Sequence, residues 1–480
     1  MIRATIVLCA AACASSAWMD SAAAQSSSSM QSAATSGAEA SLVRLRNGGM
    51  AGPASAPLTC QTPIKPSALP ASQVQHLGIH TVGETVWFNV PRHTETISII
   101  QQAWGTVPDS VVLNGFELPN AAVITLLTDP NGNLLYDDNA PPPDDRTTAH
   151  VLTYASATTG VVTLPNTTQA FADSKSGGYP AGTWSFVVND YALECVNSPS
   201  ICSGGRGDDQ YDVTVITKPV ENRTTQSLDV GIYLASDAWT ATRAIGDPYF
   251  QRFARTLAAL YAGGSVRIDT VTVYDLPAWA KARYATGVDV TDQGPCSDFS
   301  QLFTLSKPKI ELPLFFVDAI EFGGVEVHVS GIDGSIPGAA STGGTVVSGA
   351  VVDIADLAEG ACRGSIDFAN CGADAVAYVS AHEGGHYLGL YHTTEAFGDA
   401  FDPLEDTPTC SCSTACLSPT GASLCASQSF PLTAQVCTQT AQSPCGGGDN
   451  LMFWLFEPYI SKGKLSPEQG KVMRANPAVQ

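Results

Sequence analysis

The sequence predicts a multidomain protein in which an N-terminal antiparallel β-sandwich is followed by an α/β domain and an irregular, cysteine-rich segment. Two observations support this prediction. From residue 82 to 218, short segments of alternating apolar and polar residues are separated by turn signals, which is typical of a sandwich. After residue 226, strand-like segments alternate with helical periodicity, which indicates a sheet covered by helices. At 480 residues and 44% hydrophobic content, the chain is long enough for two or three domains.

The first 24 residues have the layout of a secretory signal peptide, with the basic Arg3, an apolar run from Ile6 and small residues up to Ala24. We therefore expect a secreted or extracellular protein. A lipid anchor on Cys13 or a periplasmic location is the less favoured alternative. Residues 25–81 begin with a Ser, Ala and Gly-rich stretch and predict a flexible leader or pro-segment.

Composition also limits the partners. The 23 Lys and Arg against 45 Asp and Glu leave a net charge of -22, which argues against a nucleic-acid partner. No segment after the signal has the roughly 18 to 20 uninterrupted apolar residues that a membrane span needs, so no transmembrane segment is expected.

Removal of the signal leaves 12 of the 14 cysteines, an even number that favours disulfides in an oxidising compartment. Cys195 with Cys202 and Cys362 with Cys371 can close small loops. Cys60 can pair with Cys296. Alternatively, it can be a latency cysteine whose thiolate occupies the open zinc position in a zymogen. Six more cysteines crowd one segment, where disulfides are favoured over a second metal cluster. These six are Cys410, Cys412, Cys416, Cys425, Cys437 and Cys445.

The α/β part has clear element boundaries. Residues 227–235 alternate as a strand, and Asp247 with Pro248 predicts the start of a helix that ends at Gly263 and Gly264. Further strands are predicted within 265–276, 311–320, 325–332 and 345–357.

The segment "HEGGHYLGLYH", residues 382–392, follows these strands. A helix capped by Asp374 would place His382 and His386, four residues apart, on one face. Gly389 would end the helix in a left-handed conformation and let His392 return as a third ligand. Three imidazoles leave one position of a zinc ion open for water, as in catalytic sites. Gly384 and Gly385 weaken the helix, so they predict a close approach of the sheet or a substrate.

This segment resembles the HExxHxxGxxH signature of the metzincin metallopeptidases. The segments "DPLEDTP" (402–408), "DNLMFW" (449–454) and "LSPEQGKVMR" (465–474) resemble those that follow the zinc helix in the pappalysin group. The resemblance covers residues 227–477. It implies a catalytic domain, residues 227–480, with a sheet-and-helix lobe over an irregular, disulfide-rich lower lobe. Residues 82–218 resemble, in pattern alone, the small jelly-roll modules that accompany secreted bacterial proteases.

The resemblance implies a zinc endopeptidase that acts on protein or peptide substrates, with Glu383 as general base and Met452 in a turn beneath the ligands. It also implies calcium (Ca²⁺) at Asp402, Asp406 and Asp449, whose carboxylates suit that cation. Trp454 departs from the pattern, because relatives carry a tyrosine there that helps to hold the oxyanion. An indole N–H can donate a hydrogen bond but cannot bind zinc.

Two other functions are open at this stage. One is a matrix- or surface-binding protein with an inactive protease domain, suggested by the long sandwich and the missing tyrosine; the intact Glu383 argues against it. The other is a zinc hydrolase that acts on something other than peptides.

Overall fold

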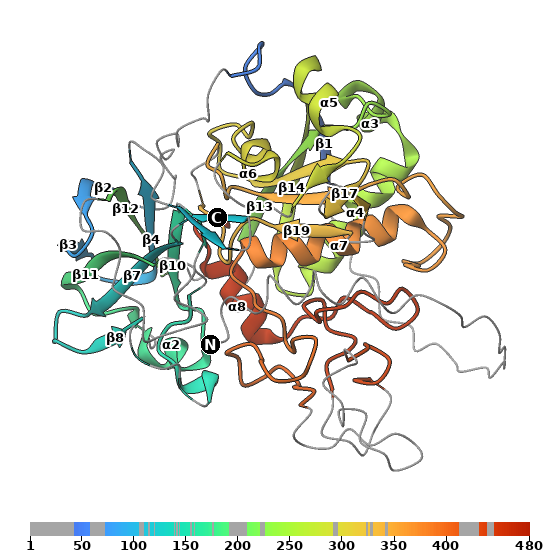
Figure 1. Ribbon diagram of the computed structural model, residues 1–480. Coiled ribbons are helices and arrows are strands. Elements are labelled where there is room, and N and C mark those ends of the chain that lie inside the picture. Colours follow the sequence, from blue (N-terminus) through green and yellow to red (C-terminus); the bar gives the residue numbers. More distant parts are fainter. Residues whose placement is uncertain are drawn as a thin grey trace.

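The computed structural model describes the chain from residue 43 to 480 with gaps, and the protein is multidomain, built mostly of β-sheets with a few helices (Figure 1). The predicted signal peptide, Cys60, Cys195 and Cys202 lie outside the described residues. Those residues exclude 58–72, 105–109, 114–115, 120, 139, 141–142, 144, 154–155, 158, 175–176, 192–208, 221–225, 291–295, 323–324, 327–329, 341–343, 412–431 and 439–445.

The predicted sandwich consists of two antiparallel sheets. The first has the order β10-β4-β12-β2 and the second the order β3-β11-β7-β8, with β9 paired to β7. Apolar side chains of both sheets share one core that includes Trp184, Phe186 and Tyr211. The strands are β2 (Gln73–Thr81), β3 (Thr85–Val90), β4 (Thr94–Ala103), β7 (Ala121–Thr128), β8 (Leu134–Tyr136), β9 (Ser156–Ala157), β10 (Thr159–Leu164), β11 (Gly182–Tyr191) and β12 (Gln210–Pro219).

The described part of this half also contains four smaller elements. Strands β5 (Ser110–Leu113) and β6 (Phe116–Pro119) form a hairpin. The 3-10 helix η1 (Arg146–Thr148) and helix α2 (Thr168–Ser174) lie in the connections that follow β8 and β10.

The second half is built on a six-stranded sheet of order β1-β14-β13-β16-β20-β19, parallel except for the edge strand β19. Helices α4 and α7 share one hydrophobic core with this sheet, and α5 and α6 share another. The strands are β1 (Arg44–Met50), β13 (Gln226–Leu234), β14 (Val266–Asp275), β16 (Leu312–Val317), β19 (Gly331–Asp333) and β20 (Ala350–Asp353). The helices are α3 (Ala241–Gly246), α4 (Pro248–Ala262), α5 (Ala278–Tyr284), α6 (Asp298–Phe303), α7 (Gly372–Tyr387) and α8 (Pro467–Ala475). A small sheet contains β15 (Val288–Asp289), β17 (Ile320–Phe322) and β18 (Val325–Glu326).

Helix α4 follows the sequence prediction. The Asp247 side chain accepts hydrogen bonds from the backbone N–H groups of Tyr249 and Phe250, Pro248 occupies the first turn, and Gly263 ends the helix. The cap stabilises the helix start because it satisfies N–H groups that have no partner within the helix.

The first strand lies ahead of the sandwich. Residues 25–81 were predicted to be a flexible leader or pro-segment, and within this range Arg44–Met50 forms β1, parallel to β14, and Gln73–Thr81 forms β2 of the sandwich. An edge strand needs only one paired side and little apolar surface, so "RLRNGGM" gives no strand pattern. Gly48 allows the pairing, because a Cβ there would lie 2.2 Å from the Tyr274 ring.

Two predicted features of the cysteines are present. Cys362 bonds to Cys371, and Cys410 bonds to Cys437 within the cysteine-rich segment. Cys296 is also disulfide-bonded, while its predicted partner Cys60 is outside the described residues. No helix in the described part of the chain is both long and apolar enough to cross a membrane.

Candidate metal centre

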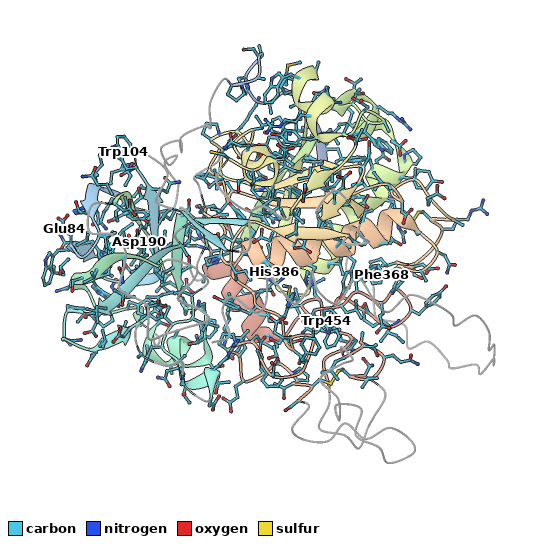
Figure 2. The ribbon with its side chains drawn as sticks, in the orientation of Figure 1. Glu84, Trp104, Asp190, Phe368, His386 and Trp454 are labelled. Atoms are coloured by element: carbon cyan, nitrogen blue, oxygen red, sulfur yellow. A yellow bond between two sulfur atoms is a disulfide. The ribbon has the colours of Figure 1, made fainter. Side chains whose placement is uncertain are left out.

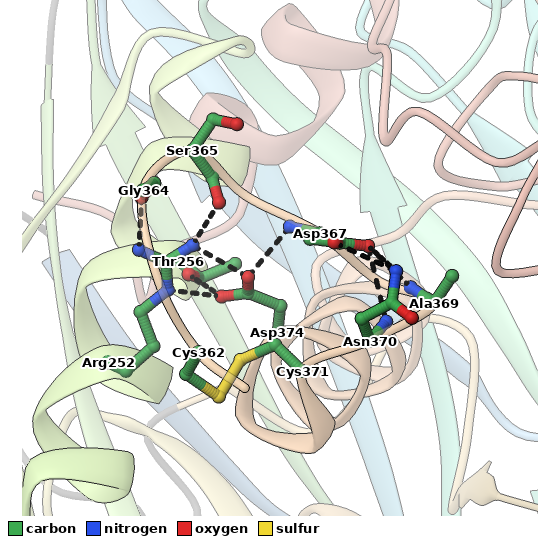
Figure 3. Close-up of polar contacts among 10 residues, drawn as sticks. All are labelled: Arg252, Thr256, Cys362, Gly364, Ser365, Asp367, Ala369, Asn370, Cys371 and Asp374. Carbon is green, nitrogen blue, oxygen red and sulfur yellow. Dashed lines mark hydrogen bonds and ion pairs between the residues drawn. A yellow bond between two sulfur atoms is a disulfide. The ribbon is translucent and has the colours of Figure 1, made fainter. Parts of the chain in front are cut away.

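Helix α7 carries the first two histidines, and an ion pair between the half-buried Arg252 and the buried Asp374 fixes its start (Figure 3). The expected cap, Asp374, lies inside the first turn, and Cys371 is the N-cap residue without a capping side-chain bond. The fully buried Asp374 instead accepts two hydrogen bonds from Arg252 at 2.7 Å and one from Thr256 at 2.5 Å. A buried carboxylate needs such partners, which come from α4. The anchor therefore couples the two helices.

The two glycines of the motif are sites of close approach, as predicted. A Cβ at Gly384 would lie 2.2 Å from Tyr261 Oη and 2.6 Å from Leu312 Cδ2. A Cβ at Gly385 would lie 2.6 Å from the sulfur of Met452. The helix thus packs against α4, the sheet and the methionine at distances that no other residue allows.

The turn after α7 has the expected conformation. Gly389 has φ 105°, a left-handed value that glycine adopts without strain. The chain then reverses, and His392 returns to the face of α7 that carries His382 and His386.

The three imidazoles converge. Their candidate ligand atoms lie within 4.8 Å of one another, and His392 Nε2 lies 3.2 Å from His382 Nε2 and 3.1 Å from His386 Nε2. Nitrogen ligands at about 2.0–2.1 Å from a tetrahedral zinc ion are about 3.3 Å apart. The spacing therefore fits one shared ion, and the three histidines could hold a metal.

Each imidazole is oriented by an acceptor on its other nitrogen. Nδ1 of His382 lies 2.7 Å from the Leu451 carbonyl, and Nδ1 of His386 lies 2.7 Å from the Leu390 carbonyl. Nδ1 of His392 lies 3.0 Å from a Glu395 carboxylate oxygen. Because these oxygens only accept, each Nδ1 is assigned the proton and each Nε2 keeps its lone pair. Such partners fix the tautomer of metal-binding histidines.

The pKa values of the first two histidines are low. Burial and the neighbouring His392 lower the pKa of His382 to about 3, and the same two causes lower the pKa of His386 well below its ordinary value. For His392, burial lowers the pKa, but the Glu395 carboxylate outweighs it and raises the pKa above its ordinary value. Neutral imidazoles are the form that binds metals.

Glu383 lies beside this cluster and is 8% exposed. Burial raises its pKa to about 8, although His392 and the backbone N–H of Asp333 lower it. Strand β19 approaches closely here, since a Cβ at Gly331 would lie 2.7 Å from Glu383 Cγ. A cation bound by the three histidines would favour the ionised carboxylate and would therefore lower the pKa of Glu383.

The segment around Met452 lies under the helix. Met452 is fully buried against Gly385, and its carbonyl accepts a hydrogen bond from the Thr393 N–H at 2.9 Å. Asn450 Oδ1 accepts from the Met452 N–H at 2.8 Å. The segment therefore braces both α7 and the return to His392.

Trp454 has another partner. Its Nε1 donates to the Leu432 carbonyl at 2.8 Å, and the ring packs in a small core with Cys410 and Phe453. Figure 2 shows Trp454 below His386, toward the lower part of the molecule. Since this donor is already used, Trp454 is positioned as a packing residue of the cysteine-rich segment.

The three aspartates predicted to bind calcium have different hydrogen-bond and ion-pair partners. Asp406 accepts from Ser466 Oγ at 2.6 Å and from the Glu468 N–H at 2.9 Å, so it joins its loop to the start of α8. Asp449 forms an ion pair with Lys464 at 2.5 Å. Asp402 is 3% exposed, its Oδ1 accepts from Thr407, and among the described residues no hydrogen-bond partner faces its Oδ2. Within the described residues, the groups of at least three His, Cys, Asp or Glu that could hold an ion do not include these aspartates.

Sequence reasoning missed Glu395 and the two carbonyl acceptors. Glu395 stands three residues after His392, a spacing that could have identified it as a partner of the imidazole. The carbonyls of Leu390 and Leu451 carry no sequence signal, because every residue has one.

Comparisons with known proteins add little. No protein-family model matches the chain, and no curated protein matches it. Among solved structures, the chain is similar to metalloproteinase-II from Bacteroides fragilis, with 13% sequence identity over 45% of this chain and 69% of that chain and a TM-score of 0.22. A likeness at this level carries no argument about the site, so its interpretation rests on the site's own geometry.

Proposed function

We propose that this protein is a secreted zinc-dependent endopeptidase of the metzincin type, related to the pappalysin group, that hydrolyses peptide bonds of protein substrates. The observation that carries the proposal is the convergence of three histidine Nε2 atoms beside a buried glutamate. The motif resemblance and the disulfides, which persist in oxidising compartments, agree with it.

His382, His386 and His392 would hold the ion. A zinc ion bound by three imidazoles supplies Lewis acidity, which acidifies water and polarises a carbonyl. The donor set suits zinc, since neutral imidazole is a preferred ligand and three protein ligands leave room for water. Gly389, Met452 and the acceptors of the three Nδ1 protons would keep the set in place.

Glu383 would act as the general base. Its charge and that of His392 act on each other's pKa, so its carboxylate is near the histidine cluster, where it would take a proton from the attacking water and deliver it to the departing amine. Its burial excludes competing solvent. Strand β19, which reaches Glu383 through Gly331, lies at the open edge of the sheet beside the site.

The rival function is a binding protein whose protease domain is inactive. The occupied indole N–H of Trp454 agrees with the loss of the auxiliary oxyanion donor, but neither Glu383 nor any of the three histidines is replaced. A casein assay with and without 1,10-phenanthroline separates the two functions, because only the enzyme loses hydrolysis on chelation.

The decisive experiment compares Glu383→Ala and Glu383→Gln with the wild type. We expect both variants to retain zinc and to lose at least about a hundredfold in hydrolysis, as removal of a general base does. Glu359→Gln, at an exposed carboxylate in the same half of the molecule, is the matched control. Hydrolysis at the wild-type rate by purified Glu383→Ala protein would exclude the proposed mechanism.

A further inference from the structure

The third histidine lies on a loop, whereas the other two lie on α7. We define residues 392–407 as the third-ligand loop. Its two arms pair, because Thr394 and Phe401 form an antiparallel bridge and the Glu395 N–H donates to the Ala400 carbonyl at 2.9 Å. His392 is therefore linked to the second arm of the loop as well as to the Met452 segment.

The β-sandwich holds that arm. Arg146 Nη1 donates to the Phe401 carbonyl at 2.6 Å. The Thr168 N–H donates to the Pro403 carbonyl at 3.0 Å, and Thr168 Oγ1 accepts from the Glu405 N–H at 2.8 Å. The same hydroxyl donates to Glu468 on α8 at 2.5 Å. The sandwich thus satisfies backbone groups of the loop that would otherwise need water.

The two sandwich residues are themselves fixed. Arg146 lies on η1 and Thr168 begins α2. The Thr167 hydroxyl joins these elements, since it donates to the Ala149 carbonyl at 2.5 Å and accepts from the Ala170 N–H at 2.9 Å. The two elements that hold the loop are therefore joined to each other through Thr167.

Two further contacts join the sandwich to the second half of the molecule. Lys218 at the end of β12 is 1% exposed, and its ammonium donates to Gln226 at 2.7 Å and to the carbonyls of Arg474 and Val479 at 2.6 Å each. A buried ammonium has three donors and needs three acceptors, and here it has them. A second contact is apolar and joins the outer face of the sandwich to the segment after β19. Its buried residues are Ile100, Val161, Ile216, Ala339, Val346 and Val347.

We propose that the β-sandwich is a permanent support of the metal centre and that Arg146 and Thr168 are positioning residues for His392. The inference rests on the proposed function, because it concerns the same three histidines. It implies that the sandwich is neither a removable pro-region nor an independent binding module. A ligand on a loop is held less well than a ligand on a helix unless a rigid element supports it.

The test measures zinc affinity of the full chain by competition with a chromophoric chelator. The variants are Arg146→Met, which keeps the aliphatic stem, Thr168→Val, which keeps the volume, and the double variant. Arg92→Met and Thr183→Val, at exposed positions of the same sandwich, are matched controls. We expect zinc affinity to fall by about tenfold in the double variant, the lower end of effects for groups beyond the ligands, and to stay unchanged in the controls.

Hydrogen exchange of the metal-free protein gives a second readout. We expect faster exchange of amides in residues 393–407 of the variants, with α7 unchanged. An unchanged zinc affinity in a folded double variant would overturn the inference, and so would an equal rise of exchange in α7 and the loop, because that indicates general destabilisation.

The experiments distinguish a failure of the proposed function from a failure of the proposed role of the sandwich. A wild-type chain that binds zinc but does not hydrolyse protein contradicts the proposed function, while a loss of affinity in the double variant still supports the role of the sandwich. If the wild type binds no zinc, the proposed function fails, and the exchange of residues 393–407 alone decides the inference.

Discussion

Two sets of residues were predicted to bind metals, and their side chains are arranged differently in the structure. The three histidines converge, with Nε2 atoms 3.1 and 3.2 Å apart. The three aspartates do not form such a group, and Asp406 and Asp449 each have a protein partner of their own. Helical periodicity sets the relative positions of His382 and His386. In an irregular segment, by contrast, a short separation in sequence does not determine the distance between two side chains. A spacing is therefore informative where a regular element converts it into a distance.

The largest expected effect in the acidic set concerns Asp402. Burial raises its pKa to about 7, while the Thr407 hydroxyl lowers it. A raised folded-state pKa gives stability that is fully present below the unfolded value of 3.8 and is lost as the pH rises through about 7. Asp402→Asn should therefore stabilise the chelated protein at pH 8 by up to about 4 kcal/mol, at about 1.4 kcal/mol per pKa unit, and should have little effect at pH 4.

Urea unfolding with EGTA at both pH values checks this prediction. An equal effect at pH 4 and pH 8 would show that the buried charge is not the cause. Added calcium gives a further comparison. If added calcium raises the melting temperature of the wild type but not of Asp402→Asn, the aspartate set does bind the ion although its members have different partners in the metal-free protein.

The next largest expected effect is on the zinc affinity of the histidine set. Glu395→Ala removes the acceptor that orients His392, so zinc affinity should fall by about 10- to 100-fold, the usual cost of losing such a partner. Glu395→Gln should lie between the wild type and the alanine variant, because the amide oxygen still accepts. Asp399→Asn removes an exposed charge from the same loop and serves as control. Competition with a chelator measures the affinity, and equal values for Glu395→Ala and Asp399→Asn would remove Glu395 from the metal centre.

The smallest effect is expected at Asp449. Its ion-pair partner Lys464 has a side chain that is 68% exposed, and exposed pairs contribute about 0–1 kcal/mol. Asp449→Asn should therefore change the free energy of unfolding by less than about 1 kcal/mol and leave zinc affinity unchanged. Urea unfolding and the chelator assay measure both quantities. A larger change in either would mean that Asp449 acts as a ligand or as a support of Met452.

Local signals predicted the elements that carry the site. Asp247 and Pro248 marked the start of α4, and Gly389 marked the end of α7. The histidine spacing placed two imidazoles on one helix face. These predictions succeed because each depends on residues within a few positions of one another.

Long-range partners could not be predicted in the same way. Asp374 looked like a helix cap, but its carboxylate pairs with Arg252, 122 residues earlier. Strand β1 gave no alternating pattern, because pairing with β14 rather than burial stabilises it. The support of the third-ligand loop by Arg146 and Thr168 spans more than 230 residues, a separation that no local pattern covers.

Strand β1 also decides how the two halves are connected. The chain begins the six-stranded sheet at Arg44–Met50, leaves it to build the whole sandwich, and returns at Gln226 to add β13. The sandwich is thus an inserted domain with two covalent connections, and after a single proteolytic cut beside it the chain still joins it either to β1 or to β13. During synthesis, β1 must wait until Asp275 has been made before its pairing with β14 is complete. The inserted domain can fold in this interval, before the sheet that it later supports is closed.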